Sequence, residues 1–122
     1  MPPSAVPSGF RVLRSAACAA DIDRIFDHLF QAYQDLGDTP ESAFERAVVR
    51  GRAVDDAMET LGAVPFQGTL VPHIMPGLRH VRKDGAIFYF MVDESAQQVR
   101  VLAVFFGGQD HRQHMLRRIL AG

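Results

Sequence analysis

The chain has 122 residues, 48% of them hydrophobic and 22% charged, a composition typical of a folded domain that excludes extended disorder. This length suffices for one hydrophobic core and is too short for two domains. Thirteen basic residues nearly balance fourteen acidic ones, which excludes a chain built as a whole to bind polyanions. The charge is uneven, because residues 1–64 carry six basic and ten acidic groups whereas residues 65–122 carry seven and four. We therefore expect two surfaces with different partners.

The N-terminal residues and the single cysteine indicate the compartment. Residues 1–9 contain three prolines and two serines and lack the basic and apolar regions of a secretory signal. We expect a flexible leader over residues 1–9 and one domain over residues 10–122. Cys18 stands alone, which excludes an intrachain disulfide and a cysteine-based zinc site, and we expect it to be a small core residue. The longest apolar run is far shorter than the roughly 20 residues that span a bilayer, so we expect a cytoplasmic protein with no membrane partner.

The first elements are a short strand and a helix. Residues 10–14 alternate apolar with basic side chains and predict an edge strand. From Cys18 the apolar residues fall at helical spacing as far as Tyr33, and Gly37 marks the end of this helix.

A second helix is predicted from Pro40 to about Leu61. Asp38 or Thr39 can cap it, and proline suits its first turn. The connection between the two helices is short, so they should form an antiparallel hairpin. Gly51, in the middle of the second helix, costs about 1 kcal/mol relative to alanine, and we expect it to allow close packing against the first helix.

The second half of the chain predicts an antiparallel meander. Residues 65–77 hold three prolines and two glycines, and we expect a loop without a regular element there. Three strands follow, over residues 78–83, 86–92 and 99–106. Asp84-Gly85 predicts a two-residue hairpin turn between the first two, Gly107-Gly108 closes the meander, and residues 109–120 predict a terminal helix. The predicted fold class is α+β: an N-terminal strand, an antiparallel helical hairpin, a three-stranded antiparallel meander and a C-terminal helix.

The middle strand is apolar on both faces. Ile87 and Tyr89 alternate with Phe88 and Phe90, and the helical hairpin can cover only one of these faces. The other face needs a cover from the terminal helix, a dimer mate or another protein chain.

A polar cluster opens the terminal helix. His111 and His114 stand three residues apart beside Asp110, so both rings could share a ligand. The simplest interpretation is a solvated first turn capped by Asp110. A second is a general acid–base site for phosphodiester cleavage, in which arginines stabilise the phosphorane. A metal site needs a third ligand, for which His73 or His80 is the candidate, and we expect no metal there.

A basic strand supplies the other cluster. Arg79 and Lys83 share one face with Val81, whereas His80 and Arg82 share the other. Such a strand can follow phosphates or pair with acidic side chains of a partner, and the spacing does not choose between them. The chain has no phosphate-binding loop, nucleophile elbow or dinucleotide motif, so we expect no cofactor.

The chain from Phe10 to Leu120 resembles the RelE/ParE superfamily of toxins from type II toxin–antitoxin pairs. The stretch that carries the resemblance is PGLRHVRKDGAIFYFMVDESAQQVRVLAVFFGGQDH. Its Gly-Leu-Arg strand, Ile-Phe-Tyr strand and glycine turn are similar to the ParE branch, which is associated with plasmid stabilization. The resemblance implies a growth-inhibiting toxin in a hetero-oligomer with a cognate antitoxin, whose C-terminal segment wraps over the helices and the sheet. The implied antitoxin contacts are Arg79, Arg82, Lys83, Phe88, Phe90 and Phe106.

Two activities are implied. RelE-like members are ribosome-dependent mRNA endoribonucleases, and the corresponding set here is Arg79, Arg82, His111, Arg112 and His114. Ala86 stands where those nucleases place an arginine, and no tyrosine follows Tyr89. ParE-like members poison DNA gyrase and have no known catalytic residues. These departures favour a non-enzymatic gyrase poison over a nuclease acting on ribosome-bound messenger, and a member that binds its antitoxin without harming the cell is the third option.

Overall fold

The computed structural model describes residues 9–106 and 110–121, and it has the predicted α+β architecture. The chain order is β1 (Arg11–Arg14), α1 (Ala16–Asp35), α2 (Pro40–Glu59), the 3-10 turn η2 (Thr60–Gly62), β2 (Thr69–Leu70), β3 (Arg79–Lys83), β4 (Ala86–Asp93), β5 (Gln98–Phe106) and α3 (His111–Ala121). The expected leader, apart from Gly9, and the segment 107–109 lie outside the described residues. No helix in the described part of the chain is long and apolar enough to cross a membrane.

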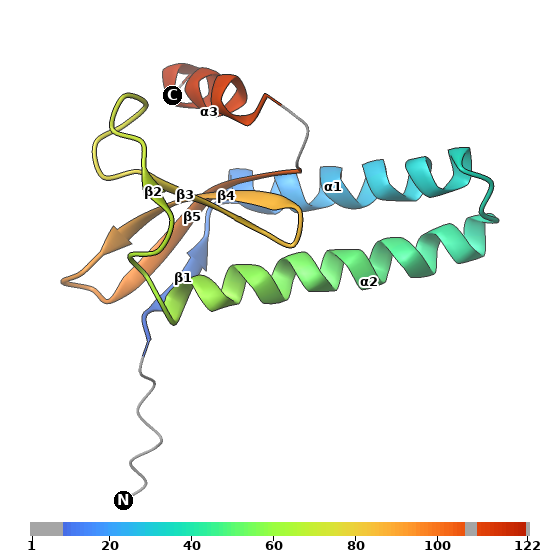
Figure 1. Cartoon of the computed structure of the whole chain (residues 1–122), viewed down its shortest axis with the longest axis horizontal. Coiled ribbons are helices and arrows are strands. Elements are labelled where there is room, and N and C mark those ends of the chain that lie inside the picture. Colours follow the sequence, from blue (N-terminus) through green and yellow to red (C-terminus); the bar gives the residue numbers. More distant parts are fainter. Residues whose placement is uncertain (1–8, 107–109, 122) are drawn as a thin grey trace, which may run out of the picture.

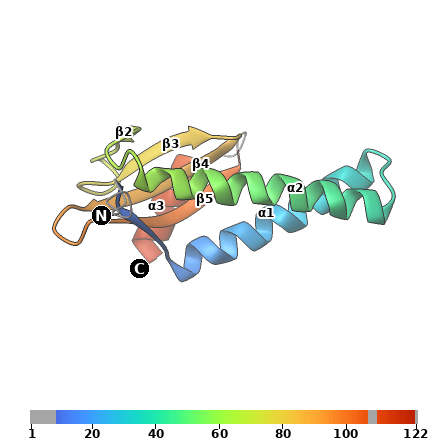
Figure 2. The same ribbon diagram turned by 90° about the horizontal axis from the view of Figure 1, so that it is seen from below.

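The strands form one five-stranded sheet in the order β1-β5-β4-β3-β2. β3, β4 and β5 are the predicted antiparallel meander, and β1 lies at the edge, parallel to β5. The α1–α2 hairpin packs on one face of this sheet and α3 lies across the other (Figure 1). Seen from below, the far end of the hairpin extends well beyond the strands (Figure 2).

Local capping sets where the helices begin. The Ser15 hydroxyl accepts a hydrogen bond from the backbone N–H of Cys18 at 3.0 Å, so α1 begins at Ala16, slightly earlier than predicted. Thr39 caps α2 in the same way, accepting from the N–H of Ser42 at 3.2 Å, with Pro40 in the first turn. These caps satisfy N–H groups that the helices themselves cannot pair.

Turn chemistry explains the β3–β4 hairpin. Asp84 and Gly85 have φ values of 50° and 76°, the left-handed pair that a type I′ turn requires, as their sequence predicted. The expectation that residues 65–77 hold no regular element was wrong, because Thr69 and Leu70 pair with β3. Gly68, with φ of 79°, makes this possible: a Cβ there would collide with the carbonyl oxygen of His80.

The prediction for Gly51 was also wrong. A Cβ placed on it would meet nothing within 4 Å, so close packing does not account for this glycine. A close contact between backbone segments occurs at Gly62, in η2. Its carbonyl accepts a hydrogen bond from the N–H of Phe10 at 2.7 Å. A Cβ at Gly62 would collide with the carbonyl oxygen of Phe10.

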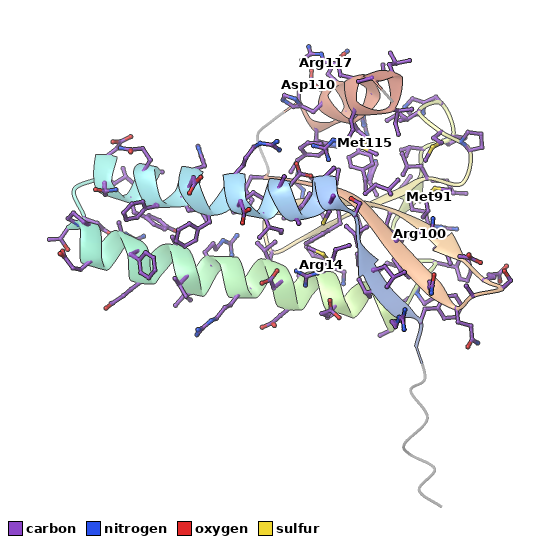
Figure 3. The ribbon with its side chains drawn as sticks, turned by 180° about the vertical axis from the view of Figure 1, so that it is seen from behind. Arg14, Met91, Arg100, Asp110, Met115 and Arg117 are labelled. Carbon is purple, nitrogen blue, oxygen red and sulfur yellow. The ribbon has the colours of Figure 1, made fainter. Side chains whose placement is uncertain are left out.

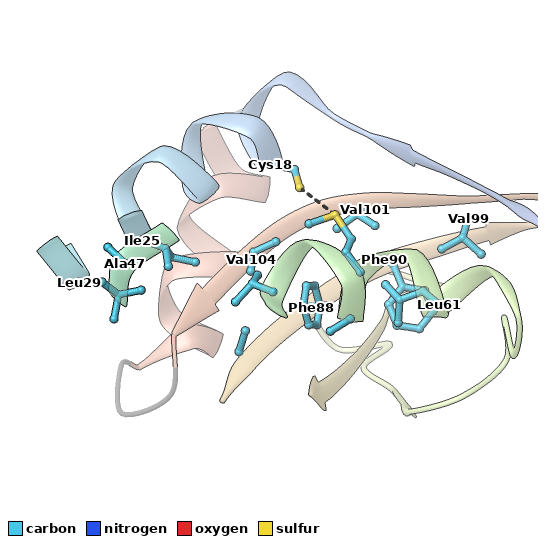
Figure 4. Close-up of a cluster of buried hydrophobic side chains, with 14 residues drawn as sticks. Cys18, Ile25, Leu29, Ala47, Leu61, Phe88, Phe90, Val99, Val101 and Val104 are labelled. Atoms are coloured by element: carbon cyan, nitrogen blue, oxygen red, sulfur yellow. Dashed lines mark hydrogen bonds between the residues drawn. The ribbon is translucent and has the colours of Figure 1, made fainter. Parts of the chain in front are cut away.

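The sheet separates two hydrophobic clusters. Beneath the hairpin, Phe88 and Phe90 pack with Val104, Leu61 and Cys18, whose Sγ lies 3.9 Å from Met58 Sδ (Figure 4). On the opposite face Tyr89 and Ile87 pack with Phe105, Leu78, Val71 and Met115 of α3. The terminal helix and the segment around residues 71–78 therefore supply the cover that the doubly apolar strands require.

Candidate functional site

A buried ion pair fastens the end of α3 to the rest of the domain. Asp21 of α1 is 3% exposed, and its two oxygens accept from the Nη1 and Nη2 of Arg118 at 2.8 and 2.7 Å. Oδ2 also accepts from the backbone N–H of Val104 at 3.0 Å, and Oδ1 from Arg24 at 3.0 Å. These hydrogen bonds raise the pKa of Arg118 further above its usual value. One carboxylate thus joins α1, β5 and α3.

The beginning of α3 is held by a second polar contact, the histidine cluster of His80, Tyr89 and His111. The Tyr89 hydroxyl lies 2.8 Å from Nδ1 of His111. β-Sheet register places His80 opposite Tyr89, and its ring centroid lies 5.3 Å from that of Tyr89 and 5.8 Å from that of His111. Nε2 of His80 is buried and has no hydrogen-bond partner among the described residues. Met115, midway along α3, points toward the sheet between these contacts, whereas Arg117 points away from it (Figure 3).

Burial and nearby positive charge shift the pKa values of the two histidines in this cluster toward the uncharged form. The pKa of His80 is lowered by burial first and then by His111 and Arg112. Burial also lowers the pKa of His111, with further contributions from Arg112 and Arg82. Burial raises the pKa of Tyr89, which favours the protonated phenol beside Nδ1 of His111.

The basic residues of β3 divide between the two faces of the sheet, as alternation predicted. Arg79 and Val81 lie opposite Phe90 and Phe88 on the hairpin face, whereas Arg82 lies opposite Ile87 on the α3 face. The guanidinium of Arg79 donates to the carbonyl oxygens of Phe66 at 2.9 Å and Gln67 at 3.5 Å, and its Cζ lies 5.4 Å from the centre of the Phe66 ring. Arg79 therefore orders the preceding loop.

The structure does not bring His111 and His114 to a shared ligand. His114 stacks on Phe105 at a centroid distance of 5.8 Å, while His111 contacts Tyr89. Within the described residues no three histidine, cysteine, aspartate or glutamate side chains are placed to hold a metal ion. The Asp110 carboxylate accepts a hydrogen bond from the N–H of Gln113 at 3.4 Å. Asp110 therefore caps α3, as the simplest interpretation of this polar cluster predicted.

The expected antitoxin contacts fall into accessible and inaccessible groups. Phe88 and Phe90 have no exposed surface, because the hairpin covers them, so a partner could contact them only if the hairpin moved. Phe106 is half-buried, and Cζ of Arg50 lies 5.7 Å from the centre of its ring. Lys83 is half-buried and Arg82 is exposed. The basic side chains, and not the buried phenylalanines, are available to an acidic partner.

Two members of the α3 contacts were missed by sequence reasoning. Neither Asp21, which lies among apolar residues of α1, nor Arg118 was predicted to belong to a site. A carboxylate within an apolar helical stripe signals a buried ion pair, but its partner here is 97 residues away.

Comparison with known proteins identifies the fold. No protein-family model matches this sequence, and no curated protein matches it significantly. A chain of the chromosomal ParDE toxin–antitoxin system from P. aeruginosa is similar in structure, with a TM-score of 0.61, 22% identity, and coverage of 82% of this chain and 98% of that chain. A chain of the RelBE2 toxin–antitoxin complex from Mycobacterium tuberculosis has a TM-score of 0.53 and 15% identity, and the match covers 85% and 98% of the two chains. This chain therefore has the α+β fold of the RelE/ParE toxins.

Proposed function

We propose that this chain is the toxin of a type II toxin–antitoxin pair, that it arrests growth by binding and poisoning DNA gyrase, and that a cognate antitoxin neutralises it in a hetero-oligomer. The shared fold supports the toxin assignment, because both similar structures are described as toxin–antitoxin systems. The exposed basic side chains of β3 and α3 suit an acidic antitoxin segment.

The expected nuclease residues lie on both faces of the sheet, and this observation supports binding over catalysis. Phosphodiester cleavage needs a base, an acid and a cation around one phosphate. Arg79 lies on the hairpin face and its guanidinium holds loop carbonyls, whereas His111 lies on the opposite face. His114 stacks on Phe105 and not on Tyr89, although the centroids of these two rings lie only 6.0 Å apart. No single phosphate could meet this set as it stands.

One observation favours the alternative, an mRNA endoribonuclease acting on the ribosome. The histidine cluster combines two imidazoles with a phenol, and Arg82 and Arg112 lie close enough to lower the pKa of His111. These are the groups that acid–base cleavage of RNA uses. Tyr89 is fully buried beneath α3, so this activity requires α3 to move away from the sheet.

The test uses the purified full-length chain with purified gyrase. We expect inhibition of supercoiling and accumulation of cleaved gyrase–DNA complexes, because a poison traps the enzyme on DNA. His111→Gln should retain this effect, because no proton transfer at His111 is required for binding. Unaffected gyrase, together with cleavage of ribosome-bound messenger that His111→Gln abolishes, would establish the nuclease instead. Inactivity in both assays, with a folded protein, would leave only antitoxin binding.

A further inference from the structure

A pocket lies between α1, the end of β5 and α3, and it is lined in part by Phe106 and His114, two of the expected site residues. Its volume is about 490 Å³, within the range of sites that bind small ligands or single large side chains. Its inner wall is apolar and is formed by Ile25, Val104, Phe105 and Phe106. We call it the α1–α3 pocket.

The rim of the α1–α3 pocket carries hydrogen-bond donors and a net positive charge, from two arginines against one carboxylate. Arg24 and His28 come from α1, and His114 and Arg118 come from α3. Among the described lining residues Asp21 is the one carboxylate, and four donor atoms already occupy its two oxygens. An incoming anion would therefore meet donors on the rim and no unsatisfied carboxylate.

The surroundings limit the size of that anion. At 100° per residue, Asp23 and Asp27 project from the side of α1 away from the pocket, where both are exposed. A nucleic-acid backbone is longer than the pocket, and where it continued across α1 these carboxylates would repel it, whereas a short peptide ends at the rim. The aliphatic groups of Ile25 and Val104 also offer no hydrogen bond to the edge of a base.

We propose that the α1–α3 pocket binds an acidic segment of the antitoxin, with a large apolar side chain against its inner wall and flanking carboxylates on its rim. An aromatic side chain would bury about 150–250 Å² there. The partner's identity rests on the proposed toxin–antitoxin function, whereas the chemistry of the segment rests on the pocket. Because α1 and α3 both contribute, an occupied pocket also holds α3 against the sheet.

The test titrates the full-length chain with a short synthetic peptide in which glutamate and phenylalanine alternate. Binding is measured by fluorescence anisotropy and located by NMR shifts of backbone amides. We expect shifts at Arg24, His28 and His114, and affinity about 10-fold weaker in the Arg24→Gln/His114→Gln variant. The matched control, Arg52→Gln, removes an exposed charge from α2 outside the pocket and should bind as the wild type does. Circular dichroism confirms that each variant is folded.

Three results would overturn the inference. A peptide with glutamine in place of glutamate could bind equally well, the double variant could bind like the control, or a single-stranded oligonucleotide could occupy the same residues in preference to the peptide. Gyrase poisoning is measured separately. If the chain poisons gyrase but gives any of these three results, the pocket assignment fails and the proposed function stands. If the peptide binds a chain that does not affect gyrase, the proposed function fails and the pocket chemistry stands.

Discussion

The substitution Asp21→Asn tests the attachment of α3 most severely. The asparagine keeps the shape of the side chain, so no cavity forms, and its remaining oxygen can still accept from the N–H of Val104. Its amide NH₂, however, would face donors of Arg118 or Arg24 where a carboxylate oxygen accepted before. The change therefore removes the charge of a buried pair and places donor against donor.

The expected cost follows from burial. Removing one partner of a fully buried ion pair costs about 3–5 kcal/mol, and a hydrogen bond to a charged group contributes about 1.5–3 kcal/mol. The side chain of Arg118 is 28% exposed, so water recovers part of its solvation. We expect the free energy of unfolding to fall by about 2–3 kcal/mol, a large share of the roughly 5–15 kcal/mol of a typical domain.

Urea unfolding followed by circular dichroism measures this change, and amide hydrogen exchange locates it. Exchange should accelerate most in α3, because Asp21 links that helix to α1 and β5. The control is Asp55→Asn, which breaks the exposed 2.8 Å pair with Arg14 and should cost less than about 1 kcal/mol. The reasoning is refuted if the free energy of unfolding of Asp21→Asn lies within about 0.5 kcal/mol of the wild-type value and the amides of α3 exchange equally slowly in both proteins.

Three further predictions follow from single positions. Gly51→Ala should raise the free energy of unfolding by about 0.5–1 kcal/mol, because the added methyl meets open space and alanine favours helix; a loss in urea unfolding would contradict this. Burial and nearby positive charges lower the pKa of His80 and His111 below 6.5 in the folded chain, so the unfolded chain binds more protons and stability should fall as pH drops through 6.5. In the His80→Gln/His111→Gln variant, the free energy of unfolding, measured with urea at several pH values, should fall less steeply as the pH drops. An equal slope would show that these two histidines do not cause the fall. Burial raises the pKa of Cys18 to about 11, so the folded protein should not react with a thiol reagent at about pH 8, whereas reaction before unfolding would show that the thiol is accessible.

Local signals in the sequence predicted the elements that depend on neighbours in the chain. Thr39 and Pro40 begin α2, and Asp84-Gly85 turns β3 into β4, because cap and turn chemistry act over a few residues. Alternation along β4 separated Phe88 from Tyr89 correctly. It could not tell which face a partner would reach, because that depends on where the helices pack.

The contacts of α3 could not be predicted in the same way. Asp21 meets Val104 and Arg118, which are 83 and 97 residues away, and no periodicity links positions so distant. His111 meets Tyr89 because α3 lies across the sheet, an arrangement that tertiary packing determines. Strand alternation separated Arg79 from His80 and Arg82, but it predicted neither the position of His111 nor the loop carbonyls that hold Arg79.

Expression of the full chain alone in a bacterial host tests the central claim most directly, with separate readouts of the DNA-damage response and of messenger integrity. Our account predicts growth arrest, an induced DNA-damage response and intact transcripts, for the wild type and for His111→Gln alike. Arrest with codon-level messenger cleavage, no DNA damage and full relief in His111→Gln would contradict it.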